Sequence, residues 1–372
     1  MKEGWEYRRF ESCLIKVSKQ VQVKSKDYKK EGKFPIVSQE AELISGYWDD
    51  EAIVYKHKEP VVIFGDHTKN IKYVDFDFVV GADGTHILST KNDIEPKFFY
   101  YVLKSIKLRE LGYARHYKLL KEEYIPVPPL SEQQTIVDYL DSAFAKIDAM
   151  KANAEKALNE AKALFQASLK EMLEPKEGWK EKKLGEICSD IRYGTSTPSN
   201  ENGEYKYLRM NNITNDGFLD VSHYKTISLP EKELEKCLVK KGDIIFNRTN
   251  SRELVGKSCV FTEDENMVIA GYLIRIRLKD GFEPQFITYS MNLQRSLGLF
   301  QHLIVGAVHQ ANISANNIQK VIINYPLLSE QQSIVATLDS LKSKVDCLQA
   351  NFEKISQECD ALKQTILRQV FE

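Results

Sequence analysis

Residues 128–174 read PPLSEQQTIVDYLDSAFAKIDAMKANAEKALNEAKALFQASLKEMLE, and the same pattern returns at the C-terminus. Residues 326–372 read PLLSEQQSIVATLDSLKSKVDCLQANFEKISQECDALKQTILRQVFE. The two stretches align at an offset of 198 without a gap, and close to half of their positions are identical. A segment that occurs twice in this way indicates that the chain contains an internal duplication.

Each copy predicts one long helix. Ser131 and Ser329 are N-cap candidates, and Gln134 and Gln332, three residues later, would complete capping boxes. Apolar residues then recur in heptads without Gly or Pro, which is typical of a coiled coil. The expected seam is Leu140, Ile147, Met150, Ala154, Ala157, Ala161 and Leu164 in the first copy, and Leu338, Leu341, Val345, Leu348, Phe352, Ile355, Cys359, Leu362 and Ile366 in the second. We therefore expect the helices to pack on each other, with two separate solvent-side helices as the alternative.

Two shorter motifs also occur twice. KEGW at 2–5 returns at 176–179, and EPKFFYY at 95–101 returns as EPQFITY at 283–289. The offsets of 174, 188 and 198 increase along the chain, so the repeats keep their order. The whole chain is therefore interpreted as one duplicated unit, with a longer second globular part.

The duplicated unit is a globular domain followed by a long helix. We expect a first domain at 1–129, a central helix at 130–174, a second domain at 175–327 and a C-terminal helix at 328–372. Helices should run from Pro96 to Leu111 and begin again at Pro284. Short β-branched or aromatic segments between turn residues predict strands at 34–38, 52–55, 60–64, 71–74, 78–80, 86–89, 205–209, 243–247, 257–261 and 272–278. The expected fold class is α+β, with a mixed or antiparallel sheet in each domain.

The composition limits the class of protein to which the chain can belong. The 372 residues are 42% hydrophobic and 28% charged, which suits two or more folded domains rather than disorder. Apolar runs of membrane-spanning length, a signal peptide and CxxC pairs are missing from the sequence, so we expect a cytoplasmic protein with reduced thiols and no membrane contact. The net charge of −1 is unusual for a nucleic-acid-binding protein, but basic residues cluster at 16–33 and 104–121.

Motifs of catalysis are incomplete or missing. GKS at 256–258 ends like a phosphate-binding loop, but Ser251 stands where that loop needs Gly. Asp83, Glu95 and Lys97 have the order of a nuclease metal site, but the duplicate replaces the lysine with Gln285. The sequence also lacks an Asn-Pro-Pro-Tyr/Phe methylation motif, G-x-G-x-x-G and HExxH. We therefore expect neither catalysis nor metal binding by this chain. A stand-alone methyltransferase or nuclease, and a coiled-coil scaffold, are the alternatives.

Polar loops at matching places in the two halves are better candidates for function. The loop after the first helix carries cations and aromatics, which suit phosphates and base edges, and its counterpart carries amides and an imidazole. The DNA-binding candidates are His67, Thr68, Lys69, Arg115, His116, Tyr117 and Lys118 in the first half, and Arg209, Asn211, Asn212, Asn247, Arg248, Thr249, Asn250, Arg252, His309, Gln310 and Asn312 in the second. Because the equivalent loops differ, the halves should read different sequences, with ordinary solvated loops as the alternative.

The sequence resembles a known family along its whole length. With LSEQQ-x-IV at both helix starts, GDII at 242–245, VGK at 255–257 and IINYP at 322–326, it is similar to the specificity subunit of type I restriction-modification systems. VIFGD at 62–66 stands in the first half in place of GDII. The resemblance implies two target-recognition domains that each read one half of a split double-stranded DNA site. It also implies two helices that pair antiparallel and fix the distance between the halves.

The same resemblance implies partners. Two modification (M) subunits would dock on the helices, and restriction (R) subunits would join the full complex. S-adenosylmethionine, ATP and Mg are then expected on those partners, with no cofactor bound by this chain. Glu132 and Gln133, with their equivalents Glu330 and Gln331, are not explained by helix capping, so we expect them to contact a partner subunit.

Overall fold

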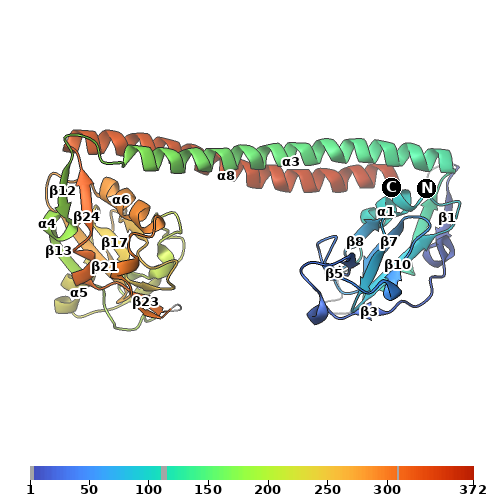
Figure 1. Ribbon diagram of the computed structural model, residues 1–372, viewed down its shortest axis with the longest axis horizontal. Coiled ribbons are helices and arrows are strands. Elements are labelled where there is room, and N and C mark those ends of the chain that lie inside the picture. Colours follow the sequence, from blue (N-terminus) through green and yellow to red (C-terminus); the bar gives the residue numbers. More distant parts are fainter. Residues whose placement is uncertain (1–3, 110–114, 308–309) are drawn as a thin grey trace. The chain divides into compact units, whose positions relative to one another are not determined.

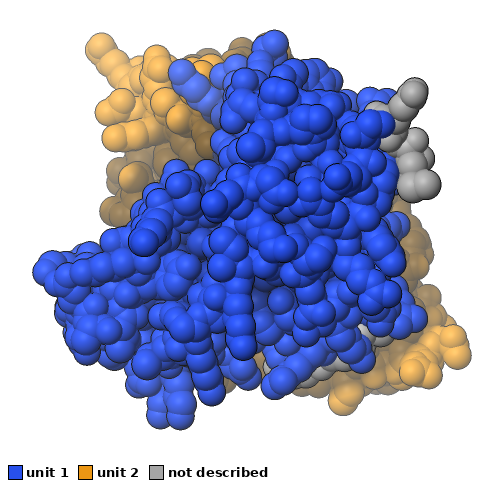
Figure 2. Space-filling model, turned by 90° about the vertical axis from the view of Figure 1, so that its right-hand side faces the viewer, with its two compact units in different colours: residues 1–156, 350–372 blue, residues 157–349 orange. Residues whose placement is uncertain are grey.

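The computed structural model describes residues 4–109, 115–307 and 310–372. The chain divides into two compact units, which Figure 2 colours separately. Unit 1 comprises 1–156 together with 350–372, and unit 2 comprises 157–349. Each unit therefore holds a globular part and a segment of both long helices.

The described globular part of unit 1 contains a four-stranded sheet, a five-stranded sheet and one two-stranded sheet. In the four-stranded sheet, β7 (Val61–Gly65) lies between β8 (Ile71–Val74) and β10 (Thr85–Thr90) and is antiparallel to both (Figure 1). The short strand β2 (Leu14–Ile15) pairs with the other side of β10, so the order is β2-β10-β7-β8. The run VVIFG is buried at every position, as expected for a strand covered on both faces. The second sheet has the order β3-β9-β4-β5, with β4 and β9 parallel and β6 also paired with β9. Strands β1 and β11 form a separate pair.

The remaining elements of this part have the following bounds. The strands are β1 Glu6–Arg9, β2 Leu14–Ile15, β3 Gln22–Val23, β4 Phe34–Val37, β5 Gly46–Trp48, β6 Val54–Tyr55, β8 Ile71–Val74, β9 Phe78–Gly81, β10 Thr85–Thr90 and β11 Tyr124–Val127. The helices are η1 Phe10–Cys13, η2 Ser25–Asp27, η3 Glu51–Ile53, α1 Pro96–Ser105 and α2 Tyr117–Leu120.

Unit 2 repeats this plan. Its first sheet has the order β13-β21-β17-β19, and its second has the order β15-β14-β20-β16, with β14 and β20 parallel. β12 pairs with β24 as β1 pairs with β11. The described part of unit 2 also contains a three-stranded sheet, β18-β23-β22. The predicted α+β class with mixed and antiparallel sheets is confirmed.

The elements of unit 2 have the following bounds. The strands are β12 Lys180–Lys183, β13 Cys188–Tyr193, β14 Tyr205–Leu208, β15 Lys225–Ile227, β16 Leu238–Val239, β17 Ile244–Asn247, β18 Thr249–Asn250, β19 Ser258–Val260, β20 Met267–Ile269, β21 Leu273–Leu278, β22 Val305–Ala307, β23 Gln310–Asn312 and β24 Ile322–Tyr325. The helices are α4 Leu184–Ile187, η4 Met210–Asn212, α5 Glu231–Cys237, α6 Pro284–Ser296, η5 Gln301–Leu303 and α7 Ala315–Ile318.

The two long helices are α3 (Leu130–Met172) and α8 (Leu328–Phe371), and they pair antiparallel. In unit 1, α3 meets the last part of α8, where Lys363 is bonded to Asp148 and Lys151 lies 3.8 Å from Asp360. In unit 2, Lys162 of α3 donates to Gln349 of α8 at 2.8 Å. The C-terminal end of α8 also enters the core of unit 1, where Phe371 packs edge-on against Phe98.

The seam predicted for α3 is wrong by one residue at every second position. Met150 and Leu164 are 60% and 58% exposed, whereas Leu158 and Phe165 are buried. Spacings that alternate between three and four residues place the seam at Leu140, Phe144, Ile147, Ala154, Leu158, Ala161 and Phe165. In α8 the predicted seam fits better, although Leu362 is 46% exposed.

The predicted capping boxes are also wrong. α3 begins at Leu130, and the carbonyl of Pro129 accepts from the backbone amides of Glu132 and Gln133. Ser131 therefore lies within the first turn. The Gln134 amide donates to Asp138 instead of reaching back to the helix start. α8 begins in the same way at Leu328, so Ser329 also lies inside its helix.

Three local predictions differ from the structure. The helix from Pro96 ends at Ser105 rather than Leu111, because Ile106 adopts an extended conformation. The first part of the strand expected at 52–55 is the 3-10 helix η3, since the Asp50 side chain accepts from the amide of Ala52 and closes a turn. In VIFGD, Gly65 is the last residue of β7 and Asp66 follows the strand. In GDII, Gly242 and Asp243 come before β17, so these two motifs are not equivalent. Among the described helices, none is long and apolar enough to cross a bilayer.

Candidate nucleic-acid interface

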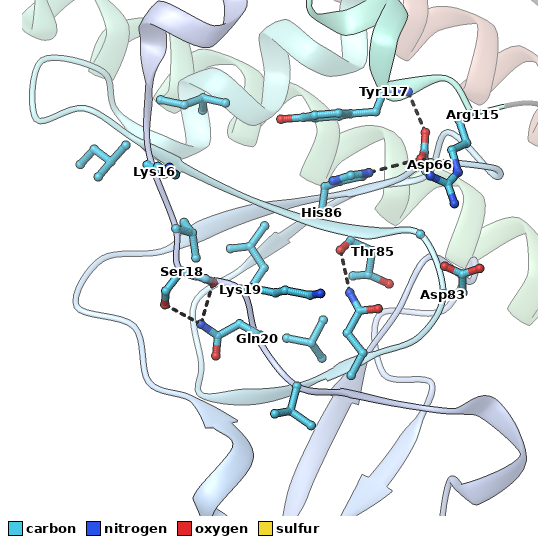
Figure 3. Close-up of a pocket in the computed structure, with 18 of the residues that line it drawn as sticks. Lys16, Ser18, Lys19, Gln20, Asp66, Asp83, Thr85, His86, Arg115 and Tyr117 are labelled. Carbon is cyan, nitrogen blue, oxygen red and sulfur yellow. Dashed lines mark hydrogen bonds and ion pairs between the residues drawn. The ribbon is translucent and has the colours of Figure 1, made fainter.

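A cleft of about 1160 Å³ opens in the globular part of unit 1 (Figure 3). We call it cleft 1. Its walls are the segment after β2, the residue that follows β7, the connection from β9 into β10, and the start of α2. The polar and charged residues that line it are Glu11, Lys16, Ser18, Lys19, Gln20, Gln22, Asp66, Asp83, Thr85, His86, Arg115 and Tyr117.

Asp66 organises one side of cleft 1. Its side chain is only 5% exposed, and its Oδ1 accepts from the backbone amide of Tyr117 at 2.8 Å. Its Oδ2 lies 3.4 Å from His86 Nε2 and 3.9 Å from Arg115 Nε (Figure 3). A buried carboxylate needs such partners, because the charge costs several kcal/mol without them. Asp66 therefore fixes the residues that form the rim of the cleft.

His86 and Tyr117 form a flat aromatic surface beside Asp66. Figure 3 shows the two rings face to face. Their centroids are 4.0 Å apart and their planes are 8° from parallel. Burial raises the pKa of the Tyr117 phenol, so it remains a neutral hydrogen-bond donor at physiological pH. Aromatic faces next to cations are typical of nucleic-acid-binding surfaces.

The predicted residues of the first half separate into two groups. Arg115, which is 75% exposed in its side chain, and Tyr117 line cleft 1. Lys118 is exposed but does not line the cleft. His116 is buried, with Nδ1 3.1 Å from the Asp66 carbonyl, and its predicted contact with DNA stays untested.

The loop that contains His67, Thr68 and Lys69 also lies outside the lining of cleft 1. It folds onto Gln39: the His67 amide donates to the Gln39 side chain, and the Thr68 hydroxyl donates to the Gln39 carbonyl at 2.6 Å. These bonds hold the loop against Gln39, and its residues do not line cleft 1.

Sequence reasoning missed several lining residues. Asp66 directly follows β7 and belongs to the polar loop that also holds the predicted His67, Thr68 and Lys69, but it was not itself named. His86 lies within β10, which pairs with β7 in the sheet, and gave no local signal. Lys16 and Lys19 belong to the basic cluster at 16–33, so this charge run did indicate the right segment.

A second cleft, of about 720 Å³, opens in unit 2, and we call it cleft 2. It brings together residues predicted from three separate loops: Arg209, Asn211, Arg248, Thr249, Gln310 and Asn312. The sheet β18-β23-β22 joins two of those loops, because Thr249 pairs with Asn312 and its hydroxyl donates to the Asn312 side chain at 2.6 Å. The lining residues that were not predicted are Thr195, Ser196, Thr197, Pro198, Tyr207, Met210, Ala270, Gly271 and Tyr272.

Arg248 occupies a defined position in cleft 2. Its guanidinium carbon lies 4.8 Å from the centroid of the Tyr193 ring, and its Nη1 donates to the Gly271 carbonyl at 3.3 Å. Nearby, burial raises the pKa of the Tyr207 phenol, which keeps this group protonated as a donor. Cleft 2 thus combines a fixed cation with neutral donors.

Two predicted residues of the second half are structural. The Asn212 side chain accepts from the Arg209 amide at 2.8 Å and donates to the carbonyls of Asp220 and His223, so this buried residue closes a turn. Asn247 is fully buried in β17. Both side chains are buried in this structure, and their predicted contact with DNA stays untested.

Of the remaining predicted residues, Asn250 and Arg252 lie near cleft 2 in sequence but do not line it. His309 lies outside the described residues.

The residues predicted to bind a partner instead link each globular part to its long helix. Gln133 is fully buried: its Oε1 accepts from the Glu95 amide, and its Nε2 donates to the carbonyls of Asp93 and Pro128. Gln331 repeats this arrangement with the amide of Glu283 and the carbonyl of Pro326. No surface of either side chain is exposed, so these two glutamines hold the fold together, and their predicted contact with a partner stays untested.

The neighbouring glutamates are bonded to the KEGW motifs. Glu132 Oε1 accepts from Trp5 Nε1 at 2.9 Å, and Glu330 Oε1 accepts from Trp179 Nε1 at 3.2 Å. Both pairs are exposed, so a partner contact of the glutamates stays a prediction. These bonds explain why the separate repeats KEGW and LSEQQ occur together.

Comparison with known proteins decides the family. A family model described as the type I restriction modification DNA specificity domain matches residues 2–160 and, a second time, 176–357. The chain belongs to this family. The resemblance inferred from the sequence is confirmed, and the two matches correspond to the two halves of the duplication.

Relatives found by sequence comparison are named as specificity subunits of type I restriction enzymes. The EcoKI specificity subunit of Escherichia coli (strain K12) is 27% identical over 263 residues, which is 66% of this chain and 56% of that relative. This match therefore spans little more than half of the relative's length. The EcoR124I/EcoR124II specificity subunit of Escherichia coli is 26% identical over 347 residues, which cover 85% of this chain and 81% of the relative.

Solved structures support the fold. A chain from a type I R-M system, from work on its complex assembly and conformational transition, aligns with a TM-score of 0.73 at 21% identity. The alignment covers 100% of this chain and 98% of that one. The HsdS subunit from Thermoanaerobacter tengcongensis gives a TM-score of 0.54 at 21% identity, covering 100% and 97% of the two chains.

The side chains give no indication of a metal centre. Within 4–109, 115–307 and 310–372, no group of three or more His, Cys, Asp or Glu side chains is arranged to hold a metal ion.

Proposed function

We propose that the chain is the DNA-binding specificity subunit of a type I restriction-modification complex, with each globular part reading one half of a split double-stranded DNA site. The observation that carries this is a pair of clefts at equivalent places in two repeats of a DNA specificity domain, lined by different side chains. Direct readout of two sequences requires two different sets of donors and acceptors. The domains 1–129 and 175–327 are the proposed target-recognition domains.

In this proposal the chain recognises DNA and other subunits act on it. Modification subunits dock on the complex and bind S-adenosylmethionine, and restriction subunits supply the ATP- and Mg-dependent steps. The proposal is supported by the name of the family and by the relatives, which are named as specificity subunits of type I restriction enzymes.

The experiment that tests this proposal is a selection from random double-stranded DNA. The full chain, with its modification subunits, is used to enrich bound sequences, which are then read by sequencing. We expect two short specific sequences separated by a gap of fixed length. Enrichment of one contiguous sequence, or of none, would contradict the proposal. Methylation by the chain alone with S-adenosylmethionine would instead support the stand-alone enzyme.

The long helices are the proposed spacer between the two halves of the site. Removing one heptad from each helix, at 151–157 and 351–357, keeps the apolar periodicity and shortens each helix by about 10 Å. At about 34 Å per turn of B-DNA, this corresponds to a gap shorter by roughly three base pairs. The selection described above measures the gap. An unchanged gap in a folded deletion variant would remove the helices from this role.

A further inference from the structure

Cleft 2 presents positive charge to its interior. Arg209 and Arg248 both line it, and among the described residues no Asp or Glu lines it. Glu233 lies outside the lining and accepts hydrogen bonds from the Thr195 and Thr197 hydroxyls. Among the described residues, neither arginine has a carboxylate within ion-pair distance, so the charge of these half-buried cations is not balanced within the chain.

An anion would supply the missing charge. The Nε atoms of Arg209 and Arg248 are buried and have no hydrogen-bond partner among the described groups, so desolvation of these cations is only partly offset. The guanidinium group of Arg248 is held by Tyr193 and the Gly271 carbonyl and does not need to be ordered on binding. A preordered planar guanidinium matches the geometry of a phosphate group.

The shape of the site favours a phosphate over a base edge. The arginines line a recess of about 720 Å³. DNA phosphates project from the duplex and can enter a recess, whereas base edges lie within the grooves and are reached by side chains that project. Asn211 and Gln310 are the exposed amides of the lining, and such side chains suit base edges.

Cleft 1 differs at the position equivalent to Arg248. Asp66 directly follows β7 as Arg248 directly follows β17. Both residues make the same backbone bonds: the Asp66 amide donates to Gly84 and its carbonyl accepts from His116, while the Arg248 amide donates to Tyr272 and its carbonyl accepts from Ile313. A carboxylate therefore stands in cleft 1 where an arginine stands in cleft 2.

We propose that cleft 2 seats one phosphate group of the DNA backbone, with Arg248 and Arg209 as its ligands, and that Asp66 excludes a phosphate from the same place in cleft 1. This inference rests on the proposed function and adds to it. Unit 2 then fixes the register of the complex on the duplex, since phosphate contacts position a protein without reading sequence.

The test combines Arg248→Gln with DNA in which single phosphates are replaced by neutral methylphosphonates. The wild-type complex should lose about tenfold in affinity at one position of the half-site that unit 2 reads, the usual loss for one charge-assisted contact. The Arg248→Gln complex should be insensitive at that position. Its salt dependence should also fall by about one unit of log Kd per log salt concentration, while the selected sequence stays the same.

Controls separate the alternatives. Lys232→Gln removes an exposed cation of α5 that does not line cleft 2 and should keep the wild-type methylphosphonate pattern. Arg248→Lys keeps the charge and should recover part of the affinity. A changed sequence preference in Arg248→Gln, or the same sensitive position in wild type and variant, would overturn the inference. If the wild-type complex shows no sequence-specific binding at all, the proposed function is overturned instead.

A last arm tests a free anion as the ligand. Inorganic phosphate is titrated into the full chain without DNA, followed by calorimetry. We expect no saturable binding, because one phosphate ion without the duplex lacks the other DNA contacts. Saturable binding that Arg248→Gln abolishes, together with a flat methylphosphonate scan, would assign the site to a free anion and overturn its assignment to DNA.

Discussion

Asp66 in unit 1 and Arg248 in unit 2 occupy one place in a repeated fold and carry opposite charges. The same backbone hydrogen bonds hold both residues, and each lines the cleft of its own unit. Asp66 binds the groups of its own chain, His86, Arg115 and the Tyr117 amide, whereas Arg248 stacks on Tyr193 and has no acidic partner among the described residues. The two halves therefore share a backbone scaffold and differ in the side chains that face the cleft.

The shared scaffold is clearest where each globular part meets its long helix. Gln133 and Gln331 are both fully buried and both accept from the residue before a helix-starting proline. Tyr101 and Tyr289 donate to Asp141 and Asp339 at 2.5 and 2.6 Å. Burial raises the pKa of both phenols, and the carboxylate that accepts the hydrogen bond from each phenol raises it further. The same contacts therefore hold both halves.

The largest expected effect tests this shared scaffold. Gln133→Ala leaves the Glu95 amide and the carbonyls of Asp93 and Pro128 without their partner, at a cost of about 3 kcal/mol in the free energy of unfolding. Gln331→Ala should cost a similar amount in unit 2. Hydrogen exchange of peptides from each unit measures the loss separately. Gln133→Glu, which places a buried carboxylate against the carbonyls of Asp93 and Pro128, should cost at least as much as Ala. Equal protection from hydrogen exchange in the wild type and all variants would show that the two glutamines do not hold the globular parts to their helices.

The next effect tests the difference between the clefts. Asp66→Ala frees His86, Arg115 and the Tyr117 amide from their common partner, so the rim of cleft 1 is no longer ordered. We expect the preference for the correct over an altered half-site of unit 1 to fall about tenfold, which is about 1.4 kcal/mol. Asp66→Asn keeps an acceptor for the Tyr117 amide and should lose less. Fluorescence titration with DNA that varies in one half-site at a time checks both variants. A loss confined to the half-site of unit 2 would contradict the assignment of cleft 1.

The smallest effect tests the paired tryptophans. Trp5→Phe and Trp179→Phe each remove one exposed hydrogen bond to a glutamate, and we expect each to cost about 0.5–1 kcal/mol in local stability. Because the two bonds are equivalent, the costs should match within about 0.5 kcal/mol, the usual agreement between independent sites. Denaturant unfolding followed by hydrogen exchange measures them. A large cost at one tryptophan only would show that the two junctions differ.

Much of the fold follows from repeats and periodicity in the sequence. β8 was predicted to the residue, and the starts of α1 and α6 follow from Glu-Pro. The seam of α3 was misplaced because Ala157 and Leu158, and likewise Leu164 and Phe165, are neighbours that are both apolar, and only packing decides between them. The predicted capping boxes failed because Pro129 and Leu327 place each serine inside its helix.

The candidate site was predictable where polar residues of separate loops converge. Arg209, Arg248 and Gln310 were named from sequence and line one cleft. Asp66 and His86 were not, because their role depends on a contact between strands that are distant in sequence. The roles of Glu132 and Gln133 were also hidden, since their partners Trp5 and Glu95 are brought close only by the fold.

The central claim is that each unit reads its own half of one DNA site. The most direct test repeats the selection from random DNA with a complex that carries Asp66→Ala and Arg115→Ala, both in cleft 1. We expect sequence preference to weaken in the half of the split site that unit 1 reads, while the other half and the gap stay as in the wild type. Loss of preference in both halves, or in neither, from a variant that still assembles with its partners would contradict the account.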